Sequence, residues 1–211
     1  HGTKWLEGSW SAQIIRRDRH RQPGLIVYSW TLHPGKTTTV DGMPVTTPAR
    51  TAFDLGRLLP RARSIPLIDA LMNATGLTAE AIAEVADAHP RERGVRRLRH
   101  TLTLVDGGAE SPQETRVRLI LVDGGLGPVE TQIRALKYRI DMGWEKYKVG
   151  VEYDGSQHWE TPEARANDIR RSEALRAAGW TLIRVSSAMM AEPEAILARA
   201  RAALRAAGRR I

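Results

Sequence analysis

The chain has no cysteine, which excludes disulfides and thiolate-bound zinc sites and fits a cytoplasmic setting. It also has no apolar run near the roughly 18 to 20 residues that a membrane-spanning helix needs. No charged-then-apolar signal segment opens it. The first residue is histidine rather than methionine, which we take to indicate a piece of a longer protein. We therefore expect neither covalent cross-links nor a membrane partner.

Positive charge is present in excess. The 211 residues include 32 Lys and Arg against 24 Asp and Glu, a formal net charge of +8. Such a charge favours a polyanionic partner, most often nucleic acid, although solvated faces of an arginine-rich chain give the same count. Residues 1–105 hold 15 basic against 9 acidic residues, whereas residues 106–211 hold 17 against 15. The second half therefore concentrates acids inside a basic protein, as a metal-assisted phosphodiesterase requires.

The first half predicts a small α+β domain. Short apolar runs between Gly and Pro, at 25–28 and 37–40, are typical of strands and hairpins. Thr47-Pro48 has the form of a helix start, and Pro60 is expected to end that helix. Further helical segments are expected over 65–72, 78–88 and the basic run 91–99. Asp106-Gly107-Gly108 is the best linker candidate, so we predict a basic, DNA-binding or regulatory domain over 1–105 and a second domain over 106–211.

The second half predicts an α/β sandwich. A helix begins at Ser111-Pro112 and ends at Asp123-Gly124-Gly125. After it we expect strands over 129–133, 136–142 and 149–153, a helix from Pro162 to Gly179, a strand over 180–185 and a helix from Pro193. This order predicts a mixed sheet flanked by helices.

Three acidic residues stand out on the predicted strands. Glu152 and Asp154 are two residues apart, so their side chains leave one face of a strand, and a hairpin through 145–148 would bring Asp141 close to them. Converging carboxylates repel one another unless a cation lies between them, and Mg²⁺ or Mn²⁺ prefers such oxygen ligands. An ion of this kind activates water and neutralises charge on a leaving oxygen. Alternatively, these acids are rim charges opposite Arg139 and Arg184.

Other polar residues have a structural and a functional interpretation. Ser111-x-x-Glu114 has the form of a capping box, so Glu114 either holds the helix start or supplies another carboxylate to a metal ion. His158, just past the acidic strand, is either a surface residue or a general acid or base. Asp168 and Arg171, three residues apart, are expected to form an intrahelical pair.

The order of these residues resembles a known family. The motifs that carry the resemblance are Arg139-Ile140-Asp141, Val151-Glu152-Tyr153-Asp154-Gly155 with His158, Asp168-x-x-Arg171, Gly179-Trp180-x-x-Ile183-Arg184-Val185, Glu110-Ser111-Pro112-x-Glu114 and Gln132. Together, over residues 108–207, they resemble the domain-of-unknown-function family numbered 559. That family is similar to very-short-patch-repair endonucleases and to restriction-endonuclease-like proteins in general.

The resemblance implies a restriction-endonuclease-like sandwich, metal-dependent phosphodiester cleavage, and Glu114, Asp141 and Glu152 as the metal-binding acids. Asp154 and His158 join them as candidate catalytic residues. One position departs from the wider superfamily, which usually has Lys two residues after the third acid, where this chain has Asp154. We expect His158 or a second metal ion to replace that Lys.

A second resemblance covers part of the first half. Val45-Thr46-Thr47-Pro48-x-Arg50-Thr51-Ala52-x-Asp54-Leu55 resembles a segment of abortive-infection-type antitoxin proteins, which implies DNA binding or regulation. Basic clusters supply phosphate contacts that position a protein without reading sequence. The nucleic-acid-binding residues predicted from both halves are Arg96, Arg97, Arg139, Arg171 and Arg184.

Two functional hypotheses remain. The first is a cytoplasmic Mg²⁺- or Mn²⁺-dependent DNA endonuclease in DNA repair or phage defence. The second is an antitoxin-like or transcription-regulating protein that retains the nuclease fold without turnover and has a toxin partner. Both hypotheses are compatible with a homo-oligomer. A glycosidase with paired carboxylates fits poorly, because nothing indicates a cleft with many exposed aromatics and the basic charge would be unexplained.

Overall fold

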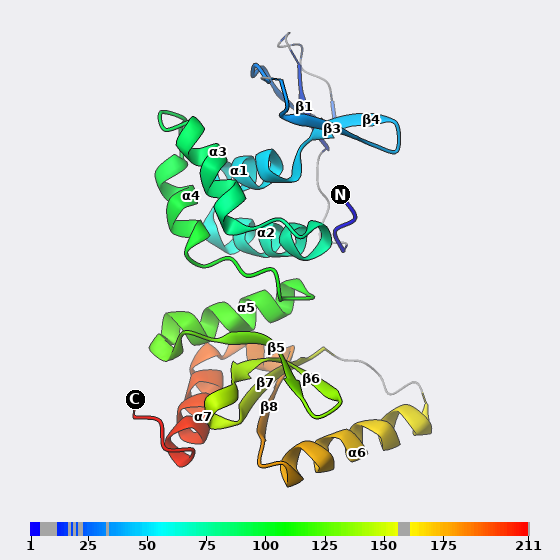
Figure 1. Ribbon diagram of the computed structural model, residues 1–211, viewed down its shortest axis with the longest axis vertical. Coiled ribbons are helices and arrows are strands. Elements are labelled where there is room, and N and C mark those ends of the chain that lie inside the picture. The colour runs from blue at the N-terminus through cyan, green and yellow to red at the C-terminus, as the bar shows by residue number, and fades with distance from the viewer. Residues whose placement is uncertain are drawn as a thin grey trace.

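The computed structural model describes residues 1–4, 12–16, 18, 20, 23–32, 34–155 and 161–210. In Figure 1 the chain forms two parts along its longest axis, an N-terminal part of short strands and helices and a C-terminal part built on a sheet. The architecture is mixed α/β, and the predicted fold class is confirmed. Within the described residues, no helix combines the length and the apolar character required to cross a membrane.

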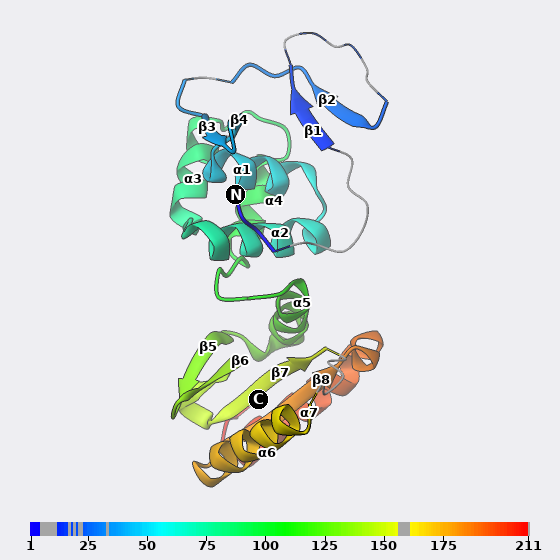
Figure 2. The same ribbon diagram turned by 90° about the vertical axis from the view of Figure 1, so that its right-hand side faces the viewer.

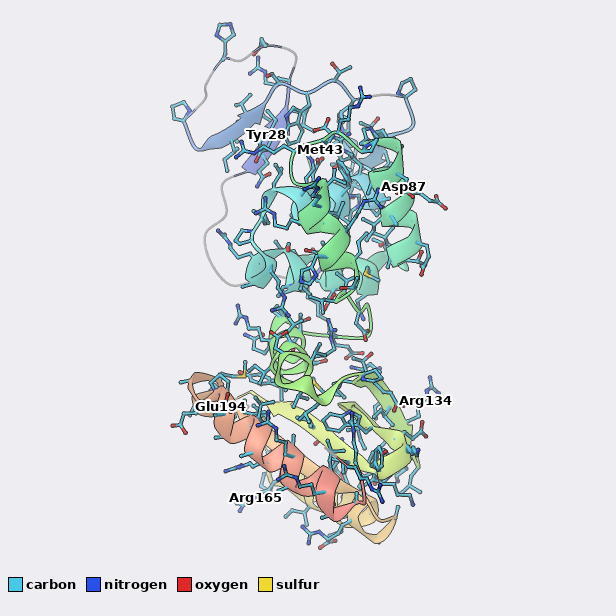
Figure 3. All side chains as sticks on the ribbon, turned by 90° about the vertical axis from the view of Figure 1, so that its left-hand side faces the viewer. Tyr28, Met43, Asp87, Arg134, Arg165 and Glu194 are labelled. Atoms are coloured by element: carbon cyan, nitrogen blue, oxygen red, sulfur yellow. The ribbon has the colours of Figure 1, made fainter. Side chains whose placement is uncertain are left out.

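In its described residues, the N-terminal part has two strand pairs and four helices. The strands are β1 (Ala12–Ile15), parallel to β2 (Leu25–Tyr28), and β3 (Thr37–Val40), antiparallel to β4 (Met43–Thr46). The helices are α1 (Pro48–Leu58), α2 (Arg61–Thr75), α3 (Ala79–Ala88) and α4 (Val95–Leu102). Phe53, Ile68, Ile82 and Leu98, one from each helix, are fully buried and meet in one core. At the surface, Asp87 extends outward from α3 (Figure 3) and pairs with Arg99 of α4.

The antitoxin-like segment forms the start of α1 and a buried ion network. The Thr47 side chain accepts a hydrogen bond from the Arg50 backbone N–H, and Pro48 occupies the first helical position. Asp54 accepts from the guanidinium groups of Arg50 and Arg57, both only 3% exposed. The spacing of Arg50, Asp54 and Arg57 along the chain therefore has a structural cause, the ion pairs that they form, in addition to any functional one.

The C-terminal part is a four-stranded mixed sheet between helices. Its helices are α5 (Pro112–Leu121), α6 (Pro162–Ala177) and α7 (Pro193–Ala206). Its strands, in sheet order, are β5 (Glu130–Ala135), β6 (Tyr138–Trp144), β7 (Val149–Asp154) and β8 (Thr181–Ser186). Shorter helical turns cover Val122–Leu126, Glu145–Tyr147 and Ala188–Ala191. Among the described strands of this sheet, β7 and β8 are the parallel pair, because α6 provides the crossover that parallel neighbours need.

The helices cover both faces of this sheet. Val117 of α5 and Leu204 of α7 are fully buried in a core with Val151 of β7. On the other face, Leu175 of α6 is buried against Ile140 of β6. Figure 2 shows α6 in front of the sheet and α5 above it, and Figure 1 shows α7 on the side of the strands away from α6. The side chains of β7 therefore alternate between an apolar core and the surface that α6 covers.

Helices α2 and α5 join the two parts. Asp69 of α2, which is 1% exposed, accepts hydrogen bonds from the Thr115 hydroxyl, the Arg118 guanidinium and the Asp106 backbone N–H. Asn73 of α2 donates to the carbonyl of Gly107. The predicted linker is thus held against the N-terminal part by hydrogen bonds, while the predicted domain boundary beside it remains a prediction.

Candidate active site

Asp141 lies where β6 and β7 separate. Backbone pairing of these strands runs from Trp144↔Val149 to Met142↔Val151 and stops there. Beyond that point the Asp141 carboxylate accepts a hydrogen bond from the Tyr153 backbone N–H at 3.0 Å, in place of a backbone carbonyl. The hairpin predicted through 145–148 is confirmed, and it brings Asp141 beside the end of β7.

Glu114 occupies the first turn of α5 as the capping pattern predicts. The Glu114 backbone N–H donates to the Ser111 side chain, and the Ser111 hydroxyl donates back to the Glu114 carboxylate at 2.9 Å. The same carboxylate accepts from the Glu110 backbone N–H at 2.9 Å and from Gln132 of β5 at 3.4 Å. Gln132 itself has a positive φ of 52°, between the paired residues Thr131 and Ile133. The capping interpretation of Glu114 is confirmed, and the cap turns its carboxylate toward β5.

Glu152 of β7 is paired with Arg171 of α6. Arg171 Nη1 donates to Glu152 Oε2 at 3.0 Å, and Nη2 donates to Glu152 Oε1 and to the carbonyl oxygen of Arg139 at 2.7 Å. The Glu152 side chain is 11% exposed and that of Arg171 is 22% exposed. A bidentate pair with this little exposure is a strong interaction because it is charge-assisted and poorly screened. It also raises the pKa of Arg171, mainly through the hydrogen bond to Glu152.

The three acids Glu114, Asp141 and Glu152 influence one another electrostatically. Burial, together with the negative charges of Glu114 and Glu152, raises the pKa of Asp141 to about 6, against the Tyr153 N–H and Arg171, which lower it. The acids thus come from α5, β6 and β7 to one end of the sheet. The positive charge near Asp141 does not offset its burial and the charges of its two acidic neighbours.

The other predicted residues have different surroundings. Asp154 is exposed at the end of β7, opposite Ser186 in the sheet register, and His158 lies outside the described residues. Arg139, with a side chain 55% exposed, pairs with Glu110 rather than with either strand acid. Arg184 stands opposite Glu152 in the register of β7 and β8, as the sequence suggested, but its guanidinium binds Asp168, and the ion pair of Glu152 is with Arg171.

The predicted intrahelical pair of Asp168 and Arg171 is wrong. Asp168 accepts a hydrogen bond from Arg184 of β8 at 2.7 Å, while Arg171 binds Glu152. Both side chains reach from α6 to the sheet because the helix packs across it, and spacing along one helix gives no information on such partners. The pairing of Arg171 with Glu152 is accordingly the feature of this site that the sequence did not reveal.

Arg96 and Arg97 belong to another region. Both lie on α4, where Arg97 donates to the backbone carbonyl of Arg57 and Arg96 is exposed. In Figure 1, α4 is on the left of the N-terminal part, whereas the start of α5 and the end of β7 are on the right. A nucleic acid that touched both regions would have to cross the molecule.

The donor chemistry at Asp141 suits a divalent cation. Carboxylate oxygens are the ligands that Mg²⁺ and Mn²⁺ prefer, and Asp141 lies close enough to Glu114 and Glu152 for their charges to act on it. Among the residues that the structure describes, however, no three His, Asp or Glu side chains form a group that could hold a metal ion. Glu152 is engaged by Arg171, and Glu114 is engaged in its cap. Asp141, Glu152 and Glu114 each keep lone pairs that a cation could use, and Arg171 would compete with it for Glu152.

Comparison with known proteins gives two family matches. Residues 114–204 match the model of the family REase_MTES_1575, a restriction-endonuclease-like domain. Residues 15–104 match the AbiEi antitoxin C-terminal domain. Both resemblances predicted from the sequence are confirmed, and the restriction-endonuclease-like match agrees with the helix-flanked mixed sheet. They associate the C-terminal part with nucleases and the N-terminal part with DNA-binding antitoxins.

Two curated relatives come from strains of Mycobacterium tuberculosis. They are described as the uncharacterized proteins MT2308 and Rv2248, and each is 29% identical to this chain over 149 residues. The match covers 68% of this chain and 55% of each relative, so the chain spans about half the length of these proteins. No solved structure matches the chain.

Proposed function

We propose that this protein is a DNA endonuclease that depends on Mg²⁺ or Mn²⁺, with its active site at the end of β6 and β7. The observation that carries the proposal is the position of Asp141, whose carboxylate caps the Tyr153 N–H where the strands part and lies near Glu114 and Glu152. The match of residues 114–204 to a restriction-endonuclease-like family supports it.

Asp141 and Glu152 are the proposed metal ligands, with Glu114 as a third. A bound divalent cation supplies positive charge to the phosphate and makes water a better nucleophile. The Tyr153 N–H orients the Asp141 carboxylate, and the Ser111 cap orients Glu114, so each acid is held by a group outside the reaction. Such supporting hydrogen bonds set the geometry and basicity of ligands.

Arginines near the end of β7 are the proposed contacts to the DNA backbone. Arg139 exposes half of its side chain beside the site, and Arg184 lies on the neighbouring strand β8. Arg96 and Arg97 on α4 remain proposed contacts for a second stretch of nucleic acid. Such contacts to phosphate predict binding that weakens steeply with salt.

A cleavage assay with matched variants tests the proposal. Supercoiled, linear duplex and single-stranded DNA are incubated with wild type, Asp141→Asn, Glu152→Gln and the control Glu163→Gln, with Mg²⁺, Mn²⁺ or EDTA. Glu163 is exposed in the first turn of α6 and supplies no group to the site. We expect metal-dependent cleavage that both site variants lower at least about 100-fold and that the control retains. Identical background cleavage by all four proteins would refute the proposal.

The second candidate is an antitoxin-like DNA-binding regulator with a toxin partner. The match of residues 15–104 to an antitoxin domain favours it, as does the engagement of Glu152 by Arg171. This candidate predicts salt-sensitive DNA binding that is equal in EDTA and in Mn²⁺, together with no cleavage. A DNA-binding titration in both conditions separates the two candidates, because the endonuclease requires that Mn²⁺ change the complex and Asp141→Asn abolish that change.

A further inference from the structure

Arg171 is the cation that the described structure sets among the site acids. It binds Glu152 through two nitrogens, and its charge lowers the pKa of Asp141. Asp141 and Glu152 therefore both interact with one guanidinium, which is hydrogen-bonded to Glu152, a proposed metal ligand. Because Arg171 uses two lone-pair sites of Glu152 and its charge repels a second cation, a metal ion competes with Arg171 for Glu152.

The guanidinium has donors in reserve. A guanidinium carries five N–H groups, and the hydrogen bonds to Glu152 and to the Arg139 carbonyl use three of them. Within the described part of the chain, the Nε–H and the second Nη1–H have no protein acceptor. These two donors lie on opposite edges of the guanidinium, so a phosphate can be held in a bidentate manner only through a pair of donors that Glu152 or the Arg139 carbonyl now uses.

The helix that carries Arg171 is held to the sheet by few apolar contacts. Leu175 is the buried apolar anchor of α6 among its described residues, and Asp168 adds a polar link to Arg184. Ile169 of the same helix is half exposed. A helix with this composition permits a change in the partner of Arg171 without the loss of a large core.

The Asp154 carboxylate affects how a phosphate could bind at this end of the sheet. An exposed carboxylate at the end of β7 repels a phosphate, and it stands two residues after Glu152 on the same face of the strand. A positive group on the facing helix is required to offset it. Arg171 is the arginine of α6 that reaches Glu152.

We propose that Arg171 exchanges partners during the reaction: it holds Glu152 in the metal-free protein and transfers its guanidinium to the DNA phosphate when Glu152 turns to the cation. This inference rests on the proposed endonuclease function. It makes Arg171 a competitor of the metal before binding and a catalytic residue afterwards.

Direct metal titration tests this exchange. Mn²⁺ affinity is measured by calorimetry for wild type, Arg171→Gln, Arg171→Lys and the control Arg170→Gln, whose arginine is exposed and hydrogen-bonds Asn167 of its own helix. We expect Arg171→Gln to bind Mn²⁺ about tenfold more tightly, because a charge-assisted competitor is removed. DNA cleavage by the same variant is expected to fall about 100-fold or more. Arg171→Lys should lie between the two in both measurements, and Arg170→Gln should match wild type.

The outcomes distinguish this inference from the function it rests on. If wild type binds Mn²⁺ and cleaves DNA but Arg171→Gln binds Mn²⁺ equally or more weakly, Arg171 is a structural clamp and the exchange is refuted. If no variant binds Mn²⁺ or cleaves DNA, the endonuclease proposal fails as well. Thermal unfolding reports whether Arg171→Gln folds; if it does not, Arg171→Lys decides, and Mn²⁺ affinity no higher than that of wild type refutes the exchange.

Discussion

Asp69 of α2 and Arg118 of α5 form a buried ion pair, with 2.8 Å between Asp69 Oδ2 and Arg118 Nη2, at the junction of the two parts. Thr115, the residue after Glu114, donates to the same carboxylate. One turn of α5 thus presents Glu114 to the site and Thr115 to the N-terminal part. The junction is therefore placed to influence the position of Glu114.

The first prediction concerns the pH dependence of stability at this pair. Burial raises the pKa of Asp69 from 3.8 to about 6, against Arg118 and the other donors, which lower it. Because the pKa in the folded state exceeds that in the unfolded state, the folded protein binds more protons between these values. The contribution of Asp69 to stability is full below about pH 4 and is lost as the pH rises through 6.

Asp69→Asn removes this titration. We expect the free energy of unfolding of wild type minus that of Asp69→Asn to fall by about 2 kcal/mol between pH 4 and 7. Urea unfolding of both proteins across this range measures the difference. A difference that stays constant or rises with pH would show that the carboxylate is ionised throughout.

The second prediction concerns the cap of α5. Ser111→Ala removes the acceptor of the Glu114 N–H and a donor to the Glu114 carboxylate, and we expect a loss of about 1 kcal/mol in the free energy of unfolding. Thr78→Ala removes a comparable cap at α3, far from the site acids in the chain, at a similar cost. Because only Ser111 supports a proposed ligand, Ser111→Ala alone is expected to weaken Mn²⁺ binding, about tenfold. Equal Mn²⁺ affinities of the two variants would show that Glu114 is not a ligand of the metal ion.

The third prediction concerns the strand pair that carries Asp141 and Glu152. Gly143 has a φ of +153°, and a Cβ there would lie 2.2 Å from the Val149 carbonyl oxygen. Gly143→Ala is expected to cost about 3 kcal/mol or more, from a strained backbone and a backbone clash. Gly125→Ala is the matched control, since Gly125 has a φ of +78° with open space around its Cβ, and the cost there is about 1–2 kcal/mol. Chemical denaturation of both variants compares them, and equal losses would contradict the close packing of β6 on β7.

Local signals were sufficient for much of the fold. Ser111-Pro112 and Pro162 mark helix starts because a capping oxygen and a proline act within one turn, and the helices begin where those residues predict. The strands of the second half were also located from their apolar runs. Signals of this kind depend on neighbours along the chain, which the sequence displays directly.

Features that depend on packing were not predictable in this way. The parallel pairing of β1 with β2 depends on contacts between separate strands, and α2 starts at Arg61, directly after Pro60 and four residues before the expected segment. At the site, the sequence indicated that Asp141 and Glu152 approach each other but gave the wrong partner for Arg171. The Arg171 side chain reaches from α6 to Glu152 of β7, and the spacing of residues along the chain does not indicate such a contact.

The shared metal ion is the central proposal, and calorimetric titration of Mn²⁺ tests it most directly. Wild type should bind Mn²⁺, and Asp141→Asn and Glu152→Gln should each bind it at least about tenfold more weakly, while Glu163→Gln binds it like wild type. Mn²⁺ binding that is absent from wild type, or unchanged in both site variants, would contradict a cation held between β6 and β7.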